Sequence, residues 1–330
     1  MLNLYGKNGA DLDVVIPTRD RPGQLAATLD ALRRQSCGRF GVIVVDDGGE
    51  TEAEKLVPNA ARRSLPIRFI RNEMSIGPGA SRNRGVEASE AHYVVFIDDD
   101  CIADRGLVAR HRAALAPGDR PVVSLGPILS PPCRRLPVWT HWDADRLERE
   151  YVRIARGDTS PGWRHLYTGN VGVRREDFVA VGGFDTRFAR QEDVELGYRL
   201  GRHGCRFIFD PAAIVWHDSD RTLRGWLRIP EASARFDVLM DRLVPDSDRL
   251  SDVHDELTTR HWALRVTRPL TRTPLAHLCA VKGAVGAGWL LHAVRVDRAA
   301  LAAFSLVWDL TYCHALREAT SVSDPQRSSI

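Results

Sequence analysis

Short apolar runs alternate with amphipathic segments over the first hundred residues. The apolar runs are rich in β-branched residues and have the length of buried strands, at 12–16, 41–45, 67–70 and 93–97. The segments between them predict helices over 23–35, 50–63 and about 80–90. Strands and helices that alternate in this way predict βαβ units, and therefore an α/β fold with a mostly parallel sheet flanked by helices.

The alternation loosens after residue 100. Further strands are predicted over 121–129, 168–173, 206–209 and 214–217, and helices over 104–115, 175–180 and 194–203. Residues 130–168 contain Pro131, Pro132, Pro137 and Pro161. Because proline interrupts helices and sheets, we expect a long irregular segment there that forms a binding loop.

From about residue 219 the pattern is helical, with helices predicted over 222–243, 252–266 and 299–318. The span 257–296 holds six basic residues and no acidic one, and from Leu278 to Val294 it is strongly apolar. This segment suits a helix on an anionic membrane face or a buried helical hairpin. Burial is favoured because short apolar segments are more often core, and no window reaches the roughly 18 uncharged apolar residues that cross a bilayer.

Charge and cysteine usage limit the partners and the compartment that the sequence predicts. The net charge of +3 on 330 residues is too small to predict a nucleic-acid partner. The six cysteines lie far apart without a C-x-x-C pair, and the chain does not open with a basic segment followed by a long apolar one. These features predict reduced, mostly buried cysteines without metal-site spacing, in a cytoplasmic protein without a secretory signal.

Carboxylates cluster directly after two of the predicted strands, at 46–47 and 98–100, and a third acidic pair at 192–193 opens a later helix. Parallel strands end at one edge of the sheet, where open α/β folds bind ligands. Adjacent carboxylates favour a hard divalent cation such as Mg²⁺ or Mn²⁺, which also binds phosphate oxygens. The clusters therefore suit a site that binds a metal-chelated diphosphate and deprotonates a hydroxyl, with a solvated acidic turn as the alternative.

Eight short motifs follow one another along residues 12–218. They are Val-Ile-Pro-Thr-Arg-Asp-Arg, Val-Val-Asp-Asp-Gly, Gly-Pro-Gly-Ala-Ser-Arg-Asn-Arg-Gly, Val-Phe-Ile-Asp-Asp-Asp, Gly-Asn-Val-Gly-Val-Arg-Arg, Gly-Gly-Phe-Asp, Glu-Asp-Val-Glu-Leu-Gly-Tyr-Arg-Leu and Trp-His. In this order they resemble the family 2 glycosyltransferases. The resemblance implies a GT-A fold, which is Rossmann-like, and inverting transfer of a sugar from a nucleotide-diphosphate donor. It also implies a catalytic domain over 1–218, with a nucleotide-sugar half at about 12–101 and an acceptor half at about 102–218. The helical pattern beyond this domain predicts a C-terminal extension over 219–330.

The resemblance also assigns residues to the donor. Those expected to contact the nucleotide sugar are Pro17, Thr18, Arg19, Asp46, Asp47, Gly79, Arg82, Asn83, Asp98 and Asp99. Asp46 would accept a hydrogen bond from the base, usually uracil, and Arg82 would lie near the diphosphate at a helix start. Gly49 stands where the family often has Ser, which leaves the base preference open.

The candidate metal ligands are Asp98, Asp100 and His217, for Mn²⁺ or Mg²⁺. Asp98 and Asp100 match the family's D-x-D pattern, and Asp100 would be the direct ligand. His217 sits at a strand end where several relatives place a His, although a lone His is more often structural. Cys101 follows where many relatives have a fourth acid, and we expect a small buried residue there.

Asp193 matches the family's catalytic base, which would accept the proton of the acceptor hydroxyl as its oxygen attacks the anomeric carbon. Capping of the helix 194–203 is its structural alternative. The residues expected at the acceptor are Trp163, Gly169, Asn170 and Glu192, and further candidates for stacking on a sugar are Trp139, Trp142 and His165.

Two other functions stay open at this point. A nucleotidyltransferase-like metal–nucleotide enzyme would share the carboxylates, but residues 17–20 lack its glycine-rich loop. A non-catalytic sugar-nucleotide or glycan-binding relative would not need all of the acidic residues. The expected donor is a nucleotide sugar, with a UDP-sugar as the first expectation. The expected acceptor is a glycan, a lipid-linked molecule or a small molecule. The expected location is the cytoplasm. Peripheral contact of residues 257–296 with the inner face of the cell membrane is a further option.

Overall fold

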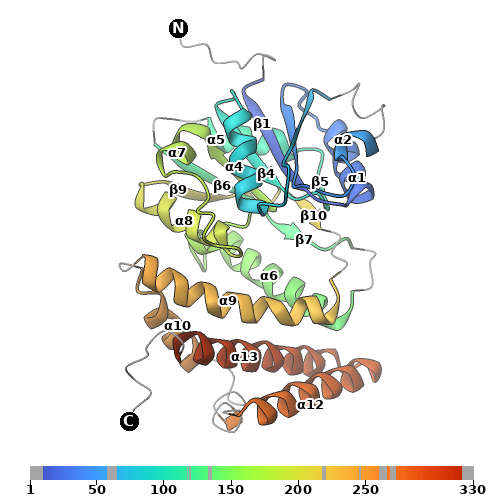
Figure 1. Cartoon of the computed structure of the whole chain (residues 1–330), viewed down its shortest axis with the longest axis vertical. Helices are drawn as coiled ribbons and strands as arrows, with labels where there is room; N and C mark the ends of the chain where they lie inside the picture. Colours follow the sequence, from blue (N-terminus) through green and yellow to red (C-terminus); the bar gives the residue numbers. More distant parts are fainter. Residues whose placement is uncertain are drawn as a thin grey trace. The chain divides into compact units, whose positions relative to one another are not determined.

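The computed structural model (Figure 1) describes residues 10–57, 65–116, 118, 120–132, 136–217, 221–244, 247–259, 266–267 and 273–321. The chain divides into two compact units. One is formed by Met1–Cys133 and Leu147–Ser219, and the other by Arg134–Arg146 and Asp220–Ile330. The first unit contains the β-sheets, and the second is helical.

A seven-stranded sheet in the order β3-β2-β1-β4-β8-β6-β9 forms the centre of the first unit. Its strands are β1 (Leu12–Thr18), β2 (Gly41–Asp46), β3 (Ile67–Arg71), β4 (Tyr93–Ile97), β6 (Val122–Leu125), β8 (Asn170–Arg174) and β9 (Arg206–Phe209). Strands β1 to β4 run parallel, whereas β8 is antiparallel to β4 and β6. The first four strands therefore end at one edge of the sheet, as the alternating pattern predicts.

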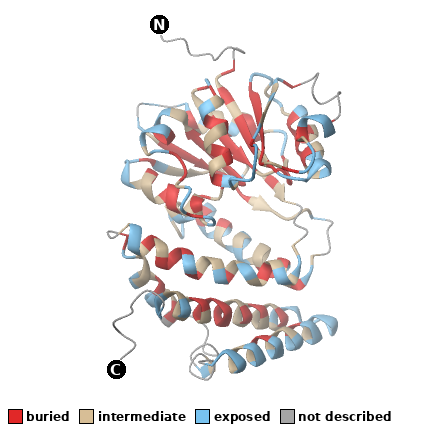
Figure 2. Ribbon diagram, in the orientation of Figure 1, coloured by how far each residue is buried: buried red, intermediate tan, exposed pale blue. Residues whose placement is uncertain are grey.

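Helices cover both faces of this sheet. They are α1 (Pro22–Arg33), α2 (Ala53–Leu56), α4 (Pro78–Ala88), α5 (Leu107–Leu115), α7 (Arg175–Ala180) and α8 (Glu192–Arg202), with the 3-10 turn η1 (Trp163–His165). Alternate residues of β1 enter different cores, because Val14 lies in a cluster with Leu29 of α1, and Val15 in a cluster with Val86 of α4. Figure 2 shows the strands as the most buried part of the unit. The predicted helix 50–63 is α2 in part, and residues 58–64 lie outside the described chain.

A small sheet of β5 (Cys101–Ala103), β10 (Val215–His217) and β7 (Ile128–Leu129) lies in the same unit. The single strand predicted over 121–129 is wrong, because Gly126 and Pro127 separate β6 from β7. A Cβ at Gly126 would lie 2.1 Å from the Ala213 carbonyl oxygen, so the backbone approaches its neighbour too closely for a side chain. Strand β10 pairs antiparallel with β5, which returns the chain to the end of β4.

The irregular segment predicted over 130–168 is also wrong in its middle, which is the 19-residue helix α6 (Val138–Arg156). The four prolines fall before residue 138 or after residue 156 and leave the helix uninterrupted. Its buried residues Val138, Trp142, Tyr151 and Ile154 recur at helical spacing. The prolines therefore mark the ends of a helix and do not indicate a loop throughout.

The second unit contains the start of α6 with α9 (Leu223–Leu243), α10 (Arg249–Thr259), α12 (Pro274–Ala293) and α13 (Asp297–Ser321). Trp142 packs against Trp226 at 5.6 Å and Trp308 at 5.1 Å between ring centroids, so this candidate for acceptor stacking lies in an aromatic core. The predicted helices 222–243 and 299–318 are confirmed. The predicted helix 252–266 corresponds to α10, and residues 260–265 lie outside the described chain.

A buried polar network joins α9, α10 and α13. Asp237 is buried and accepts hydrogen bonds from the Tyr312 hydroxyl at 2.5 Å and from Arg249 Nε at 2.6 Å. Because burial disfavours the charged carboxylate, the pKa of Asp237 is raised despite the opposing effect of Arg249. The network fixes how the three helices meet.

Helix α12 is apolar and exposed, so the burial favoured for residues 278–294 is wrong. Only Val281 and Gly288 of this helix are buried, whereas Leu275 is 71% exposed and Leu290 is 67% exposed. In the described chain, α12 and α13 are also long and apolar enough to cross a bilayer by length and composition, although the sequence pattern predicted no such segment.

Candidate active site

The acidic end of β4 lies at the sheet edge where β1 and β2 also end. Strand β4 ends at Ile97, directly before Asp98, and Thr18 at the end of β1 is opposite Asp46 of β2. Asp99 and Asp100 are buried, and the Asp98 side chain is 38% exposed. Neighbouring carboxylates that are buried need cationic or hydrogen-bonding partners. Side chains of β1, α4 and β10 supply such partners here.

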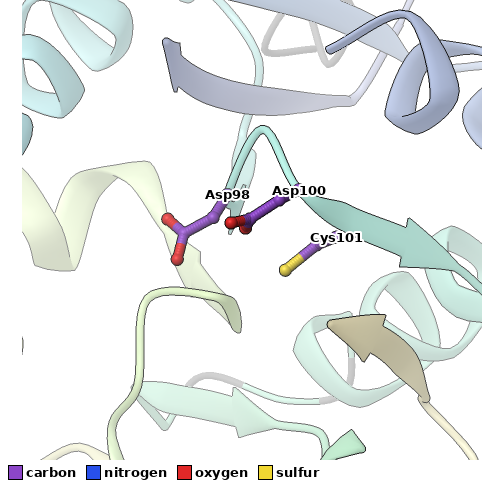
Figure 3. Close-up of side chains that lie close together, drawn as sticks. All are labelled: Asp98, Asp100 and Cys101. Atoms are coloured by element: carbon purple, nitrogen blue, oxygen red, sulfur yellow. The ribbon is translucent and has the colours of Figure 1, made fainter. Parts of the chain in front are cut away.

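The side chains of Asp98, Asp100 and Cys101 face a shared space (Figure 3). One ligand atom from each, two carboxylate oxygens and Cys101 Sγ, lie within 4.8 Å of one another. Gly169 borders this space, since a Cβ there would lie 3.4 Å from Asp98 Oδ2 and 3.8 Å from Cys101 Sγ. Among the described residues, this is the one group of three such side chains that could hold a metal ion.

His217 lies beside this group because of the pairing between β5 and β10. The register places His217 opposite Cys101, and His217 Nε2 lies 3.2 Å from Asp100 Oδ1. Burial alone would raise the pKa of Asp100, but the His217 contact and the nearby Arg21 lower it below its usual value. Asp100 is therefore held as a carboxylate, which is the form that binds a cation.

Asp99 turns toward β1 and α1. Its carboxylate accepts hydrogen bonds from Thr18 Oγ1 at 2.7 Å and from Arg21 Nη1 at 2.9 Å. The same Arg21 nitrogen lies 2.8 Å from Asp100 Oδ2, so one guanidinium bridges both carboxylates. Burial raises the pKa of Asp99 more than these partners lower it. Asp99 and Thr18, both expected at the donor, thus connect the acidic loop to the end of β1.

Arg82 on α4 joins the two ends of the site. Its side chain is 4% exposed and contacts Asp98 Oδ1 at 2.6 Å and Glu192 Oε1 at 3.0 Å. Glu192 is the first residue of α8, and the neighbouring Gly79 gives it room, since a Cβ there would lie 3.1 Å from Glu192 Cγ. The guanidinium therefore connects carboxylates that are 94 residues apart in the sequence.

Asp193 follows Glu192 in the first turn of α8. Its carboxylate accepts hydrogen bonds from the backbone N–H of Val194 at 2.9 Å and of Thr168 at 3.4 Å. Burial and the adjacent Glu192 carboxylate raise the pKa of Asp193 to about 7, while Arg82 opposes the shift. A carboxylate with a pKa near neutrality can accept a proton from a hydroxyl and return it to solvent.

Asp46 and Asp47 organise the loops around the predicted nucleotide pocket. Asp46 accepts hydrogen bonds from the backbone N–H of Gly49 at 3.1 Å and of Ala53 at 2.9 Å, and it pairs with Arg71. Asp47 accepts from Asn72, Ser75, Ile76, Gly77 and Ser81. Burial would raise the pKa of Asp47, but these hydrogen bonds lower it.

A serine at position 49, which the family often has, would require the Asp20 carboxylate to move. A Cβ there would lie 2.6 Å from Asp20 Oδ1, and that oxygen accepts a hydrogen bond from the Glu50 N–H.

Two predicted contact residues use their amides within the protein. Asn83 donates to the Phe184 carbonyl and accepts from the Phe184 N–H, both at 2.8 Å. Asn170 donates to the carbonyls of Pro127 and Ala213, and its oxygen lies 2.8 Å from a ring nitrogen of His111. These bonds position α4 and β8, and the predicted contacts of both residues with substrates stay predictions.

The remaining predicted residues lie around the same edge. Pro17 is half-buried and Arg19 is exposed at the end of β1. Trp163 of η1 is half-buried, with Tyr198 of α8 at 5.5 Å and the Arg164 guanidinium over its ring at 4.9 Å. Trp163 therefore lies next to the helix that carries Asp193.

The donor atoms present suit a divalent cation. Asp98 and Asp100 offer oxygens, His217 offers a nitrogen, and Cys101 adds a sulfur that the sequence prediction did not include. Carboxylate and imidazole ligands together are common for Mn²⁺ and Zn²⁺, whereas Mg²⁺ prefers oxygens alone. The residues thus fit the metal that the motif pattern implies.

Comparison with known proteins identifies the family. The model for Glycosyl transferase family 2 matches residues 13–182, just over half of the chain. The chain belongs to this family of glycosyltransferases, and the resemblance found in the motifs is confirmed.

Two curated relatives align with more than half of this chain. The pre-mycofactocin glycosyltransferase of Mycobacterium tuberculosis is 28% identical over 237 residues, which cover 67% of this chain and 46% of that protein. The validoxylamine A glucosyltransferase of Streptomyces hygroscopicus is 31% identical over 229 residues, which cover 58% and 52%. The chain spans about half the length of these relatives.

Solved structures share the fold. The mannosyltransferase PcManGT from Pyrobaculum calidifontis, in complex with GDP-Man and Mn²⁺, has a TM-score of 0.62 at 17% identity and covers 92% of this chain and 86% of its own. S. aureus TarS 1-349 in complex with UDP-GlcNAc has a TM-score of 0.52 at 14% identity, with 94% and 92% covered. The predicted GT-A fold with a helical C-terminal region is confirmed.

The pairing of Arg21 with the carboxylates and the position of the Cys101 sulfur were not predicted from the sequence. Arg21 lies in the motif that was quoted for the nucleotide pocket, but only Pro17, Thr18 and Arg19 were selected from it. Its pairing with Asp99 and Asp100 could have been found by asking which cation neutralises three adjacent carboxylates. Cys101 is buried, as expected, and no C-x-x-C spacing marks its sulfur as a metal ligand.

Proposed function

We propose that this protein transfers a sugar from a nucleotide-diphosphate sugar, a UDP-sugar before others, to an acceptor hydroxyl with inversion at the anomeric carbon. The observation that carries the proposal is the Arg82 bridge between Asp98 and Glu192. Because Glu192 precedes Asp193, the bridge brings the acidic end of β4 and the candidate base into one site. A donor diphosphate and an acceptor hydroxyl need that proximity.

Asp193 is the proposed general base. It removes the proton of the acceptor hydroxyl while the hydroxyl oxygen forms a bond to the anomeric carbon and the nucleotide diphosphate leaves with the electrons of the broken bond. One carboxylate suffices for this single displacement. Its pKa of about 7 supports the role, because a base of that strength is largely deprotonated just above neutrality.

Asp98, Asp100 and His217 are the proposed ligands of Mn²⁺ or Mg²⁺. When bound, such an ion neutralises the charge that develops on the diphosphate leaving group. The Mn²⁺ in the PcManGT complex supports a divalent metal in this fold. UDP-GlcNAc in TarS supports a UDP-sugar, and GDP-Man in PcManGT makes the guanine nucleotide the competitor to test.

Binding and transfer by point variants test these roles separately. Asp193→Asn should abolish transfer and leave binding of the UDP-sugar nearly intact, whereas Asp100→Ala should weaken metal-dependent binding. Asp30→Asn on α1 is the matched control, because its carboxylate pairs only with exposed Arg33 and Arg34 among the contacts described. Equal loss of binding in both site variants would contradict the assigned roles.

A screen of nucleotide sugars tests the donor. Mn²⁺ with UDP should raise the melting temperature more than either alone, and slow hydrolysis of one UDP-sugar should identify the sugar. A larger rise in melting temperature with GDP than with UDP would identify guanine, and not uracil, as the preferred base. Release of pyrophosphate from a nucleoside triphosphate would instead support a nucleotidyltransferase.

We also propose that the protein contacts the inner face of the cell membrane through α12. The exposed side of this helix is apolar, and the surrounding span 257–296 is basic without an acidic residue. Anionic lipids attract each nearby Lys or Arg by about 1 kcal/mol. An anionic surface therefore suits this segment and brings a lipid-linked acceptor within the set of substrates to test.

Flotation with vesicles tests the membrane contact. The intact protein should float with phosphatidylglycerol vesicles and much less with phosphatidylcholine vesicles, and added salt should reduce flotation. The double variant Leu275→Ser/Leu290→Ser should lose flotation, while Val152→Ser on α6, an exposed apolar residue outside 257–296, should not. Absence of flotation by the intact protein would end this proposal without affecting the proposed transfer reaction.

A further inference from the structure

Cys101 combines burial with a position at the centre of the acidic site. It is the first residue of β5, it is 1% exposed, and its thiol is not in a disulfide. Its Sγ lies within 4.8 Å of a carboxylate oxygen of Asp98 and of Asp100, and Figure 3 shows all three side chains facing the same space. A cysteine that only fills core volume does not need two carboxylates this close to its sulfur.

The distances suit one ion bound by all three side chains. Metal bonds of about 2.1 Å to oxygen and about 2.3 Å to sulfur place two ligands of one ion at most about 4.4 Å apart. The observed limit of 4.8 Å is close to that span, so small side-chain rotations bring every donor within reach. His217 adds a nitrogen next to Asp100, because the β5–β10 register places it opposite Cys101.

Gly169 borders the sulfur side of this space without a side chain. A Cβ at that position would lie 3.8 Å from Cys101 Sγ and 2.9 Å from Ile128 Cδ1. A side chain there would therefore occupy the space that faces the thiol and would press on β7. The glycine therefore adds no side-chain atom beside the thiol and the Asp98 carboxylate.

We propose that Cys101 is a direct ligand of the metal in this site and shifts its preference toward thiophilic divalent ions. This rests on the proposed function, because it concerns the same metal site. A set of two oxygens, one nitrogen and one sulfur favours Zn²⁺ and Co²⁺ over Mg²⁺, which prefers oxygens alone. On binding, the thiol proton goes to solvent and the sulfur electron pair forms the metal–sulfur bond, with no change in oxidation state.

Cobalt absorption is the direct test, with the intact purified protein free of added metal. Titration with Co²⁺ should produce the near-ultraviolet charge-transfer band of a cobalt–thiolate bond, saturating at one equivalent. Cys101→Ser should bind Co²⁺ without that band and should lower Zn²⁺ affinity at least about tenfold, while Mn²⁺ affinity changes little. Cys279→Ser, which removes an exposed thiol on α12, should leave the band unchanged.

The outcomes separate this inference from the proposed function. Co²⁺ binding by the unaltered protein without a thiolate band, or a band that persists in Cys101→Ser, would overturn the role of Cys101. Metal-dependent binding of a UDP-sugar without that band would retain the glycosyltransferase site and remove the sulfur ligand. A Cys101-dependent band in a protein that neither binds nor transfers any nucleotide sugar would support the ligand and contradict the proposed function.

A second measurement does not depend on how Cys101→Ser folds. Zn²⁺ should displace Co²⁺ from the unaltered protein and remove the band at equimolar metal, whereas Mg²⁺ should fail to do so even in large excess. Displacement by Mg²⁺ as readily as by Zn²⁺ would contradict a sulfur ligand.

Discussion

Replacing Arg82 of α4 with methionine should strongly destabilise the first unit. Methionine retains most of the apolar stem but removes the guanidinium that contacts Asp98 and Glu192. The Glu192 side chain, 10% exposed, would then be buried as a carboxylate without its cation. Truncating one member of a buried ion pair costs about 3–5 kcal/mol.

The Asp98 contact should add little to this loss. Its side chain is 38% exposed, so water screens the bond and its removal costs at most about 1 kcal/mol. We therefore expect Arg82→Met to lower the free energy of unfolding by about 4 kcal/mol.

Urea-induced unfolding followed by circular dichroism measures this change. Arg84→Met is the matched control on the same helix, because Arg84 donates to neutral oxygens of Arg71 and Asn72 and should cost about 1 kcal/mol. The double variant Arg82→Met/Glu192→Gln should recover a large part of the loss. An Arg82→Met protein within about 1 kcal/mol of the unaltered one would refute the claim that Arg82 neutralises a buried carboxylate.

Three further changes test other parts of the structure. Glu192→Gln removes a charge that raises the pKa of Asp193, so Asp193 should stay deprotonated to lower pH. The acidic limb of the kcat/KM–pH profile should therefore move toward lower pH. A limb that does not move would exclude Asp193 as the titrating base. Gly85→Ala should cost about 1–3 kcal/mol in urea unfolding, because a Cβ would lie 2.4 Å from a methyl group of β1; an unchanged midpoint would contradict that close approach. Tyr312→Phe removes the hydroxyl that donates to buried Asp237 and should lower stability by about 2 kcal/mol, and a change below about 0.5 kcal/mol would argue against the network in the second unit.

The sheet and its acidic edge could be predicted because both depend on local patterns. Apolar runs followed at once by Asp46 or Asp98 define strands and the edge where they end, and parallel pairing brings those ends together. Helix α6 was not predictable in the same way, because prolines at both ends hid its apolar spacing.

The partners of the carboxylates depend on contacts between distant segments. Arg82 could be placed at a helix start, but its pairing with Glu192 requires α4 and α8 to be adjacent, which no short pattern encodes. His217 was selected from a motif, and its position beside Asp100 follows only from the antiparallel pairing of β10 with β5. Cys101 directly follows Asp100, so its place near the carboxylates is local, and only the direction of its thiol required the structure.

The late return of β10 has a consequence for synthesis of the protein. Residues 101 and 217 pair although more than a hundred residues separate them, so a nascent chain lacks the imidazole until nearly the whole first unit has left the ribosome. A fragment limited to residues 13–182, the part that matches the family, would possess the aspartates that follow β4 but neither Asp193 nor His217. Such a fragment should be unable to carry out the reaction, even if its sheet assembles.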